Sequence, residues 1–260
     1  MERYTALAGF SPWQAWHIHS TTSTMEDARF LSTTAERGFV IADYQSAGRG
    51  RLPGRRWLAD SGKSLLVSFW LPASDFHDAP IPLAVGLALM DACSLWAASV
   101  GCTLDLRIKW PNDLFAGGKK LGGIVCESFK HEELSGQNSG NTVIIAGIGI
   151  NLSQGEFHGS YRTQPSSLYT VTGTSPSPLA LVGLLATQLT HKPGSQWRAR
   201  MMGSLYGLGK TVRFRPGANS LEPVVGTLAG IGADGSVIIE TNDGTQNYLS
   251  GDLEYDSDAD

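Results

Sequence analysis

Four arginines and three glycines are gathered in residues 48–57, Gly-Arg-Gly-Arg-Leu-Pro-Gly-Arg-Arg-Trp. Glycine lets backbone N–H groups approach an anion closely, and the guanidinium fork matches carboxylate and phosphate oxygens. The segment therefore predicts a binding loop for an anionic ligand, which we expect to be mobile when empty and ordered over that ligand. A solvated basic turn or an RNA-binding patch would have a similar composition, and the spacing is not that of a Walker phosphate loop.

A second group of polar residues, Lys-Trp-Pro-Asn-Asp at 109–113, follows a stretch that alternates between apolar and polar residues. The alternation over residues 104–110 predicts a strand, and Pro111 ends it. Lys109, Asn112 and Asp113 are therefore expected at a strand end, where α/β proteins place their sites. An ordinary turn would use the same Pro-Asn-Asp chemistry.

Lys120 begins the segment Lys-Leu-Gly-Gly-Ile. Simple alternation places it on one strand face with Gly122, Ile124 and Cys126, where the glycine clears space beside it. A lysine in that position could hold a carboxylate and stabilise charge on an acyl oxygen during activation. The alternative is a solvent-exposed lysine on an edge strand.

The segment Gly147-Ile-Gly149-Ile-Asn151 is a further candidate. Glycines within an apolar strand mark a close backbone approach, and Asn151 supplies a neutral polar tip. A single Gly-x-Gly is weak evidence for any one ligand, and no third glycine and helix of a dinucleotide fold follow it.

The elements that must position these residues alternate between strands and helices. Ser23 and Glu26 have the spacing of a capping box, which predicts a helix that starts after Ser23 and ends near Gly38. Further helices are expected at 83–98, 178–189 and 197–206. Strands are expected at 39–44, 65–71, 104–110, 121–127 and 142–148, with a hairpin loop at 135–141.

After Gly207 the pattern changes to short strands separated by Gly-Ala-Asp-Gly and Asn-Asp-Gly turns. These strands are expected at 211–215, 224–228, 236–240 and 248–249. We therefore predict a catalytic domain at 1–207, a small β domain at 208–255 and a frayed acidic tail at 256–260.

Composition excludes several classes of protein. The 260-residue chain has a net charge of −4, which argues against broad, non-specific nucleic-acid binding. Its three cysteines form no CxxC pair or zinc pattern, and its first residues do not read as a signal peptide. The most apolar stretch, 81–100, carries Asp91. We expect a protein of the cytoplasm that does not bind membranes.

In order and spacing, these motifs resemble the biotin–protein ligase family over nearly the whole chain. The family's Gly-Arg-Gly-Arg…Gly-Arg-x-Trp loop is similar to residues 48–57, and its Lys-Trp-Pro-Asn-Asp stands intact at 109–113. Its Lys-Leu-x-Gly-Ile and Gly-x-Gly-x-Asn segments are similar to 120–124 and 147–151. Its Ser-Gly-Glu segment near the C-terminus resembles 250–252.

The resemblance implies a role for each matching residue. The catalytic residues would be Arg51 and Lys120. The residues that would bind biotin are Ser23, Thr24, Met25, Gln45, Arg49, Gly50, Arg51 and Lys120. Those that would bind ATP are Arg55, Trp57, Lys109, Asn112, Asp113, Gly147 and Asn151, with Asp113 also a candidate ligand of a metal ion.

The fold implied is α+β. It has a class II synthetase-like mixed, largely antiparallel sheet flanked by helices, followed by a small C-terminal SH3-like β-barrel. The substrates implied are biotin and ATP with Mg²⁺, and the partner is a biotin carboxyl carrier protein domain of a carboxylase. About 20 residues precede the first helix, too few for a helix-turn-helix domain, so no DNA binding is expected. Both a monomer and a homodimer remain open.

One departure from the family concerns Leu52 and Pro53, which separate Arg51 from Gly54 where the family usually has one residue. A weakly active biotin-binding homologue is therefore one alternative, beside a lipoate ligase or octanoyl transferase of the same superfold and a non-catalytic RNA-binding module. Residues 155–165 are expected to form a second loop over the adenine, with Phe157 or Tyr161 as the stacking side chain.

Overall fold

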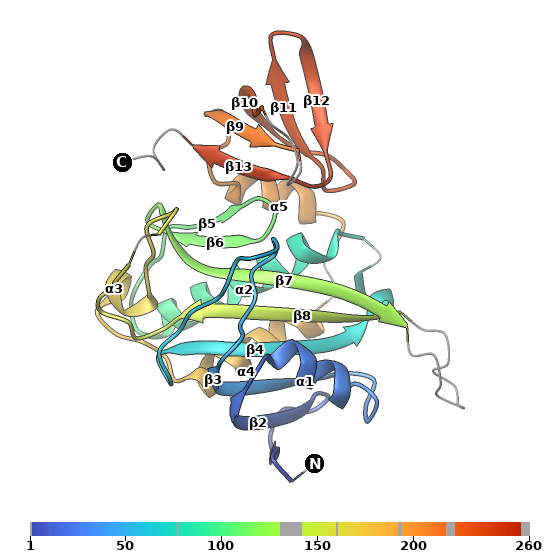
Figure 1. Cartoon of the computed structure of the whole chain (residues 1–260), viewed down its shortest axis with the longest axis vertical. Helices are drawn as coiled ribbons and strands as arrows, with labels where there is room; N and C mark the ends of the chain where they lie inside the picture. The colour runs from blue at the N-terminus through green and yellow to red at the C-terminus, as the bar shows by residue number, and fades with distance from the viewer. Residues whose placement is uncertain are drawn as a thin grey trace.

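An eight-stranded sheet and a five-stranded sheet organise the chain in the computed structural model (Figure 1). The structure describes residues 2–76, 78–130, 142–159, 161–191, 194–216 and 222–255. The loop expected at 135–141 and the acidic tail expected at 256–260 lie outside these residues.

The large sheet has the strand order β1-β2-β3-β4-β8-β7-β6-β5. β2 and β3 pair in parallel, whereas the other neighbouring strands pair antiparallel, so the mixed and largely antiparallel sheet is confirmed. The strands are β1 (Thr5–Leu7), β2 (Gln14–Thr21), β3 (Gly38–Gln45), β4 (Ser64–Pro72), β5 (Leu106–Lys109), β6 (Asp113–Ala116), β7 (Lys119–Lys130) and β8 (Thr142–Asn151).

Helices cover both faces of this sheet (Figure 1). α2 and α4 pack on one face, which we call the core face, and α1 packs on the other, which we call the α1 face. The helices are α1 (Thr24–Leu31), η1 (Ala73–Phe76), α2 (Ile81–Ser99), α3 (Leu168–Thr172), α4 (Pro178–Thr190) and α5 (Trp197–Ser204). α2 is long and apolar enough to cross a membrane, but 61% of its most apolar window is buried inside the protein, as in a core helix.

The first helix begins as predicted but ends earlier. Ser23 is its N-cap, and the Ser23 hydroxyl accepts from the backbone N–H of Met25. The predicted capping-box bond of Glu26 is replaced by a bond that its carboxylate accepts from the Thr22 hydroxyl, at 3.0 Å. The prediction that the helix extends to near Gly38 is wrong. Three consecutive hydroxyls, those of Ser32, Thr33 and Thr34, donate back to carbonyls three residues earlier and compete with helix propagation.

The five-stranded sheet follows α5 and has the order β12-β11-β10-β9-β13, with antiparallel pairing throughout. Its strands are β9 (Thr211–Arg215), β10 (Val224–Ile231), β11 (Val237–Thr241), β12 (Gly244–Tyr248) and β13 (Asp252–Tyr255). Its apolar side chains join the core of the large sheet, since the Trp110 and Phe214 rings lie 6.1 Å apart and Trp110 Nε1 donates to Gly235 O. The division into two domains at 207 and the SH3-like barrel remain predictions.

The strands predicted by apolar runs are present, with β9 at the predicted bounds. The sequence pattern did not predict β2, because His17 and His19 interrupt its apolar alternation. It also did not predict β6, which begins at Asp113 directly after the tight turn at 110–112. The strand predicted at 248–249 is divided between the end of β12 and the beginning of β13.

Candidate active site

Three glycines line the α1 face at the centre of the large sheet. Gly147 and Gly149 alternate along β8, and Gly123 of β7 lies opposite Gly149 in the register. A Cβ on Gly147 would lie 2.7 Å from Met25 Cγ, and one on Gly149 would lie 2.5 Å from Trp57 Cε2. These three positions, which we call the glycine strip, therefore let other side chains lie directly on the sheet backbone, as the sequence predicts for 147–151.

Neutral polar groups gather at one end of the glycine strip. Gln45 Oε1 accepts from the Thr24 backbone N–H at 2.7 Å and from the Thr24 hydroxyl at 3.0 Å. The Thr24 hydroxyl also lies 2.8 Å from that of Ser68, beside Gly147. Ser23 is buried at the N-cap next to them. This hydroxyl cluster (Ser23, Thr24, Gln45 and Ser68) offers both hydrogen-bond donors and acceptors without a charge.

Residues 48–57 form a hairpin that lies over the sheet. Gly50 N donates to Arg55 O and Trp57 N donates to Gly48 O, which pairs the two arms. At the tip, Arg55 N donates to Leu52 O across Pro53 and Gly54, and Gly54 has φ +78°. Proline followed by a glycine of positive φ is the pattern of a type II turn. The extra residue at Leu52-Pro53 is thus absorbed in the turn, and the hairpin places the Trp57 indole on Gly149.

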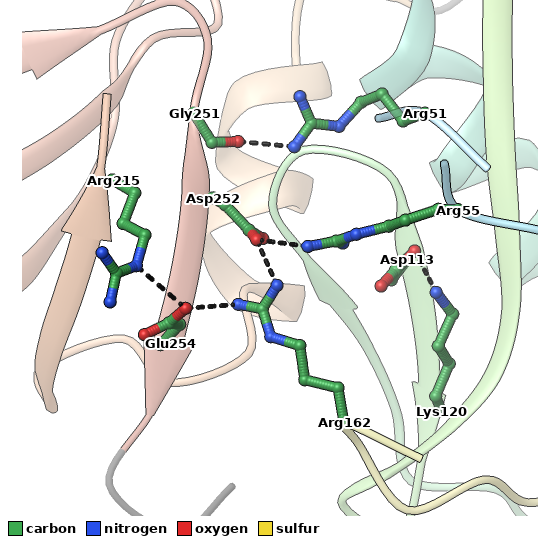
Figure 2. A network of polar contacts seen from close by, with 9 residues as sticks. All are labelled: Arg51, Arg55, Asp113, Lys120, Arg162, Arg215, Gly251, Asp252 and Glu254. Carbon is green, nitrogen blue, oxygen red and sulfur yellow. Dashed lines mark hydrogen bonds and ion pairs between the residues drawn. The ribbon is translucent and has the colours of Figure 1, made fainter. Parts of the chain in front are cut away.

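The opposite end of the glycine strip is rich in cations. Figure 2 shows Arg51, Arg55, Arg162 and Lys120 converging from three separate segments, an arrangement that we call the cationic cluster. Lys120 Nζ lies 2.8 Å from Asp113 Oδ1. The arginines contact β13: Arg51 donates to Gly251 O at 2.5 Å, and Arg55 donates to Asp252 Oδ2 at 2.8 Å. The ends of the strip therefore differ, one being neutral and one charged.

Lys120 reaches this cluster because of a β-bulge in β7. Leu114 pairs with Gly122 whereas Phe115 pairs with Lys120, so Leu121 is an extra residue. The bulge turns two consecutive residues, Leu121 and Gly122, toward the core face. The prediction that Lys120 shares a face with Gly122, Ile124 and Cys126 is therefore wrong. Its Nζ lies 3.6 Å from the Cβ position of Gly123, on the α1 face.

Three other predicted site residues are engaged within the fold. Asn112 Nδ2 donates to Ile124 O at 2.8 Å, and Asn151 Nδ2 donates to Ser166 O at 2.9 Å. Lys109 lies opposite Asp113 in the register, but it is buried, and its Nζ lies 4.9 Å from the centre of the Tyr255 ring. These side chains hold together the backbone beneath the cationic cluster.

Arg49 lies apart from the other arginines of the hairpin. Its guanidinium is 3.6 Å from Glu127 Oε1 on β7, and Glu127 also pairs with Arg29 of α1. Gly50 lies in the hairpin, where a Cβ would be 2.9 Å from Arg55 Cβ. Arg49 is thus placed beside the sheet, between the two ends of the strip.

Several buried polar atoms near the glycine strip have no hydrogen-bond partner in the described part of the chain. They are Trp57 Nε1, Arg51 Nε and the Thr21 hydroxyl oxygen. Buried polar groups in native proteins are nearly always satisfied, so such atoms favour a site that receives a polar ligand or ordered water.

Burial also sets the electrostatics of the cationic cluster. It lowers the pKa of the Arg51 guanidinium, an effect that the charge of Asp252 opposes. Burial likewise raises the pKa of the Asp252 carboxyl, but the hydrogen bonds from Arg162 and Arg55 outweigh it and leave that pKa below the ordinary value. A charge screened from water interacts more strongly with an approaching anion.

Sequence reasoning missed four residues of the site: Ser68, Arg162, Asp252 in its ion-pairing role, and Glu254. Ser68 is the only polar residue within 65–71, and that signal could have marked it. Arg162 belongs to the loop predicted over the adenine. In that loop the Phe157 and Tyr161 rings pack edge to face at 6.3 Å, and their stacking on a base remains a prediction.

The family model of the biotin/lipoate A/B protein ligases matches residues 16–149. This range includes the glycine strip, the Arg/Gly hairpin and Lys120. The chain belongs to the biotin/lipoate A/B protein ligase family. The match ends before the five-stranded sheet.

Within this family the chain groups with the biotin–protein ligases. A biotin–[acetyl-CoA-carboxylase] ligase of Paracoccus denitrificans is 30% identical over 242 residues, which cover 87% of this chain and 94% of that protein. A bifunctional ligase/repressor of Bacillus subtilis is 28% identical over 90% of this chain and 71% of its own length. The lipoate ligase alternative is not favoured.

Solved biotin–protein ligases share the fold. The structure of the Aquifex aeolicus biotin protein ligase in complex with biotin and ATP superposes with a TM-score of 0.73 and 26% sequence identity. The superposition covers 92% of this chain and 97% of that chain, so it spans both sheets.

Proposed function

We propose that this biotin–protein ligase activates biotin with ATP as biotinyl-5′-AMP and transfers the biotin to a lysine of a carrier-protein domain. One observation carries the proposal: the glycine strip joins a neutral hydroxyl cluster to a cationic cluster. Biotin has the matching chemistry, with an uncharged ring system at one end and a carboxylate at the other.

The hydroxyl cluster is the proposed site of the biotin rings. Thr24 and Gln45, with Ser23 beside them, supply donors and acceptors for a cyclic urea. Met25 packs on Gly147 and forms the apolar wall next to them. Arg49 and Gly50 would lie along the valeryl chain, with Arg49 passing from Glu127 to the substrate carboxylate.

The cationic cluster is the proposed site of activation. Lys120 and Arg51 would neutralise the biotin carboxylate and the α-phosphate, which is where charge develops as the acyl phosphate bond forms. Arg55 would hold phosphate oxygens and Trp57 would cover the nucleotide. Lys109, Asn112, Gly147 and Asn151 would support this site through the contacts that hold its floor together.

Mg²⁺ with ATP requires little dedicated protein ligation, since it is commonly held by one or two carboxylates together with phosphates. Asp113 is the carboxylate that fits this role, because it faces the cationic cluster beside Lys120. Among the described residues no group of three His, Cys, Asp or Glu side chains could bind a metal ion without the nucleotide. When bound, the ion would neutralise charge on the phosphates.

The two reactions follow from this arrangement. The biotin carboxylate attacks the α-phosphorus of ATP, and pyrophosphate leaves. The carrier lysine, in its neutral form, then attacks the acyl carbon and AMP leaves. The hairpin at 48–57 lies over the site and would keep water from the mixed anhydride between the two steps.

The proposed partner surface is the edge of β2. β1 pairs only with the first half of β2, from Ala15 to His17. In the described part of the chain no strand pairs with the outer side of residues 18–21, and these lead directly to Ser23 and Thr24. A carrier domain could add a strand there and deliver its lysine to the site. Location in the cytoplasm follows as part of the proposal, with monomer and homodimer both open.

The test is pyrophosphate release from ATP and Mg²⁺ by the purified protein, with biotin, with lipoate and with neither. We expect release that depends on biotin and is not supported by lipoate. Equal release with lipoate, or none with biotin, would contradict the proposal.

A further inference from the structure

Asp252 is the first residue of β13 and holds two loops that are far apart in the sequence. Arg55 Nη2 of the hairpin donates to Asp252 Oδ2 at 2.8 Å. Arg162 Nη1 of the second loop donates to the same oxygen. One carboxylate oxygen thus brings two guanidinium groups together, as Figure 2 shows.

Glu254, two residues further along β13, extends the same arrangement. Its Oε1 accepts from Arg162 Nη2 at 2.9 Å and from Arg215 Nε at 3.2 Å. Arg162 therefore contacts two carboxylates of one strand and is fixed at both terminal nitrogens. This geometry defines where its guanidinium lies and leaves other N–H donors free, because a guanidinium has more donors than these contacts use.

The second loop is tied to the catalytic lysine. The Lys120 backbone N–H donates to Gln164 O, and Ser166 N donates to Lys120 O, both at 2.8 Å. Lys120 also forms a parallel bridge with Pro165. Arg162 is thus only two residues from a backbone contact of the residue proposed to act on the carboxylate and α-phosphate.

The cluster has an excess of positive charge that suits a polyanion. Of the nine residues in Figure 2, five are cationic and three are carboxylates. Arg55 and Arg162 are 46% and 42% exposed, so a ligand can reach both of them. Two guanidiniums held side by side match the spacing of neighbouring phosphate groups better than one flexible cation does.

We propose that Arg162 binds the phosphate chain of ATP, and that Asp252 is a positioning residue that holds Arg162 and Arg55 together as a clamp for it. This inference rests on the proposed function and assigns the β- and γ-phosphates to this pair, while Arg51 and Lys120 act at the α-phosphate. The five-stranded sheet then takes part in nucleotide binding through β13.

A competing role for Asp252 gives the opposite sign. If Asp252 only occupied the arginines in place of phosphate, its removal would strengthen ATP binding. If it positions them, its removal frees two exposed side chains whose ordering then opposes binding, and affinity falls.

The decisive experiment is calorimetric titration with α,β-methylene-ATP and Mg²⁺, using the full-length protein saturated with biotin. This analogue cannot release pyrophosphate, so the titration reports binding alone. We expect Arg162→Ala to weaken nucleotide binding about tenfold, the effect of losing a charge-assisted hydrogen bond. Asp252→Asn should weaken it about threefold, with partial recovery in Asp252→Glu, which keeps the carboxylate.

Two controls separate positioning from damage to the fold. Asp91→Asn breaks a different surface pair, with Arg200, and should leave nucleotide binding unchanged. Biotin affinity, measured without nucleotide, should stay within about twofold in all variants, since the hydroxyl cluster is untouched. Equal losses of biotin and nucleotide affinity would indicate misfolding and overturn the positioning role.

The outcomes distinguish the clamp from the proposed function. Unchanged or tighter nucleotide binding in Asp252→Asn, or unchanged binding in Arg162→Ala, would overturn the clamp even if the wild-type protein releases pyrophosphate with biotin. Weakened nucleotide binding in both variants would support the clamp. If the wild-type protein then released no pyrophosphate with biotin, the proposed function alone would fail.

Discussion

The two faces of the eight-stranded sheet are built from alternate residues of the same strands, yet they have different chemistry. In β8, Ile144, Ala146, Ile148 and Ile150 face α2 and α4 in the core. On the opposite face, Val143 and Ile145 pack near α1, and the strand then changes to Gly147 and Gly149. The core face is apolar along its whole length, whereas the α1 face becomes open and polar toward the end where the site lies.

This difference separates stability from chemistry within one strand. Substitutions on the core face remove close-packed apolar contacts and should act on folding. Substitutions on the α1 face alter the hairpin, the hydroxyl cluster or the cationic cluster, and should act on catalysis. The predictions below test whether the two effects separate in this way.

The largest effect on activity is expected for Lys120→Ala. Loss of a cation at the point where charge develops should reduce biotin-dependent pyrophosphate release by about a hundredfold or more. The pair with Asp113 is partly exposed, so the stability loss should be about 1 kcal/mol or less. Lys119→Ala, which removes the exposed neighbouring lysine, is the matched control. Near-normal release by Lys120→Ala would remove this residue from its assigned role.

The largest effect on stability is expected for Ile148→Ala on the core face. Ile148 is 4% exposed within the main core, so its truncation should lower the free energy of unfolding by about 3 kcal/mol. Urea denaturation measures this change, and the Michaelis constants of the folded protein should remain close to wild type. A large change in those constants with unchanged stability would contradict the division between the faces.

Gly149→Ala, one residue away on the α1 face, should have the opposite profile. The added Cβ would lie 2.5 Å from Trp57 Cε2 and must displace the indole. We expect about a tenfold loss of activity, the scale reported for misplaced positioning groups, together with a change in tryptophan fluorescence. The fluorescence comparison needs the Trp57→Phe background as its control. A variant with normal activity would show that the packing of Trp57 on Gly149 is not needed.

A smaller effect is expected for Arg51→Ala in the hairpin. Arg51 Nη2 donates to Gly251 O, and this contact helps to hold the hairpin over the site. Biotinyl-AMP should leave the variant several times faster, about fivefold, because a charge-assisted contact to the phosphate is lost. Release can be followed by rapid filtration after one turnover, with Arg56→Ala as the control, since Arg56 contacts only Ser46 O among its printed-side neighbours on the exposed rim of the hairpin. Unchanged release would exclude Arg51 from adenylate retention.

Local sequence patterns predicted the parts of the site that are continuous in the chain. The Arg/Gly hairpin, the turn after Lys109 and the close approach at Gly147 and Gly149 could be predicted because glycine, proline and charge act on the local backbone. The N-cap Ser23 was predicted for the same reason.

The remaining features depend on contacts between distant segments. The bulge at Leu121 follows from how β7 pairs with β6, so simple alternation placed Lys120 on the wrong face. The contact of Arg162 with Asp252 joins residues 90 positions apart, and no local pattern marks either one as a partner of the other. Ser68 acquires its role only because β4 passes beneath Thr24.

The most direct test of the account is transfer of biotin to a purified biotin carboxyl carrier domain, measured by intact-protein mass spectrometry. With biotin, ATP and Mg²⁺, we predict that the carrier gains the mass of one biotinyl group, and that a carrier whose target lysine is replaced by arginine gains none. A carrier that stays unmodified while the enzyme binds biotin, or that is labelled equally without its lysine, would contradict the central claim.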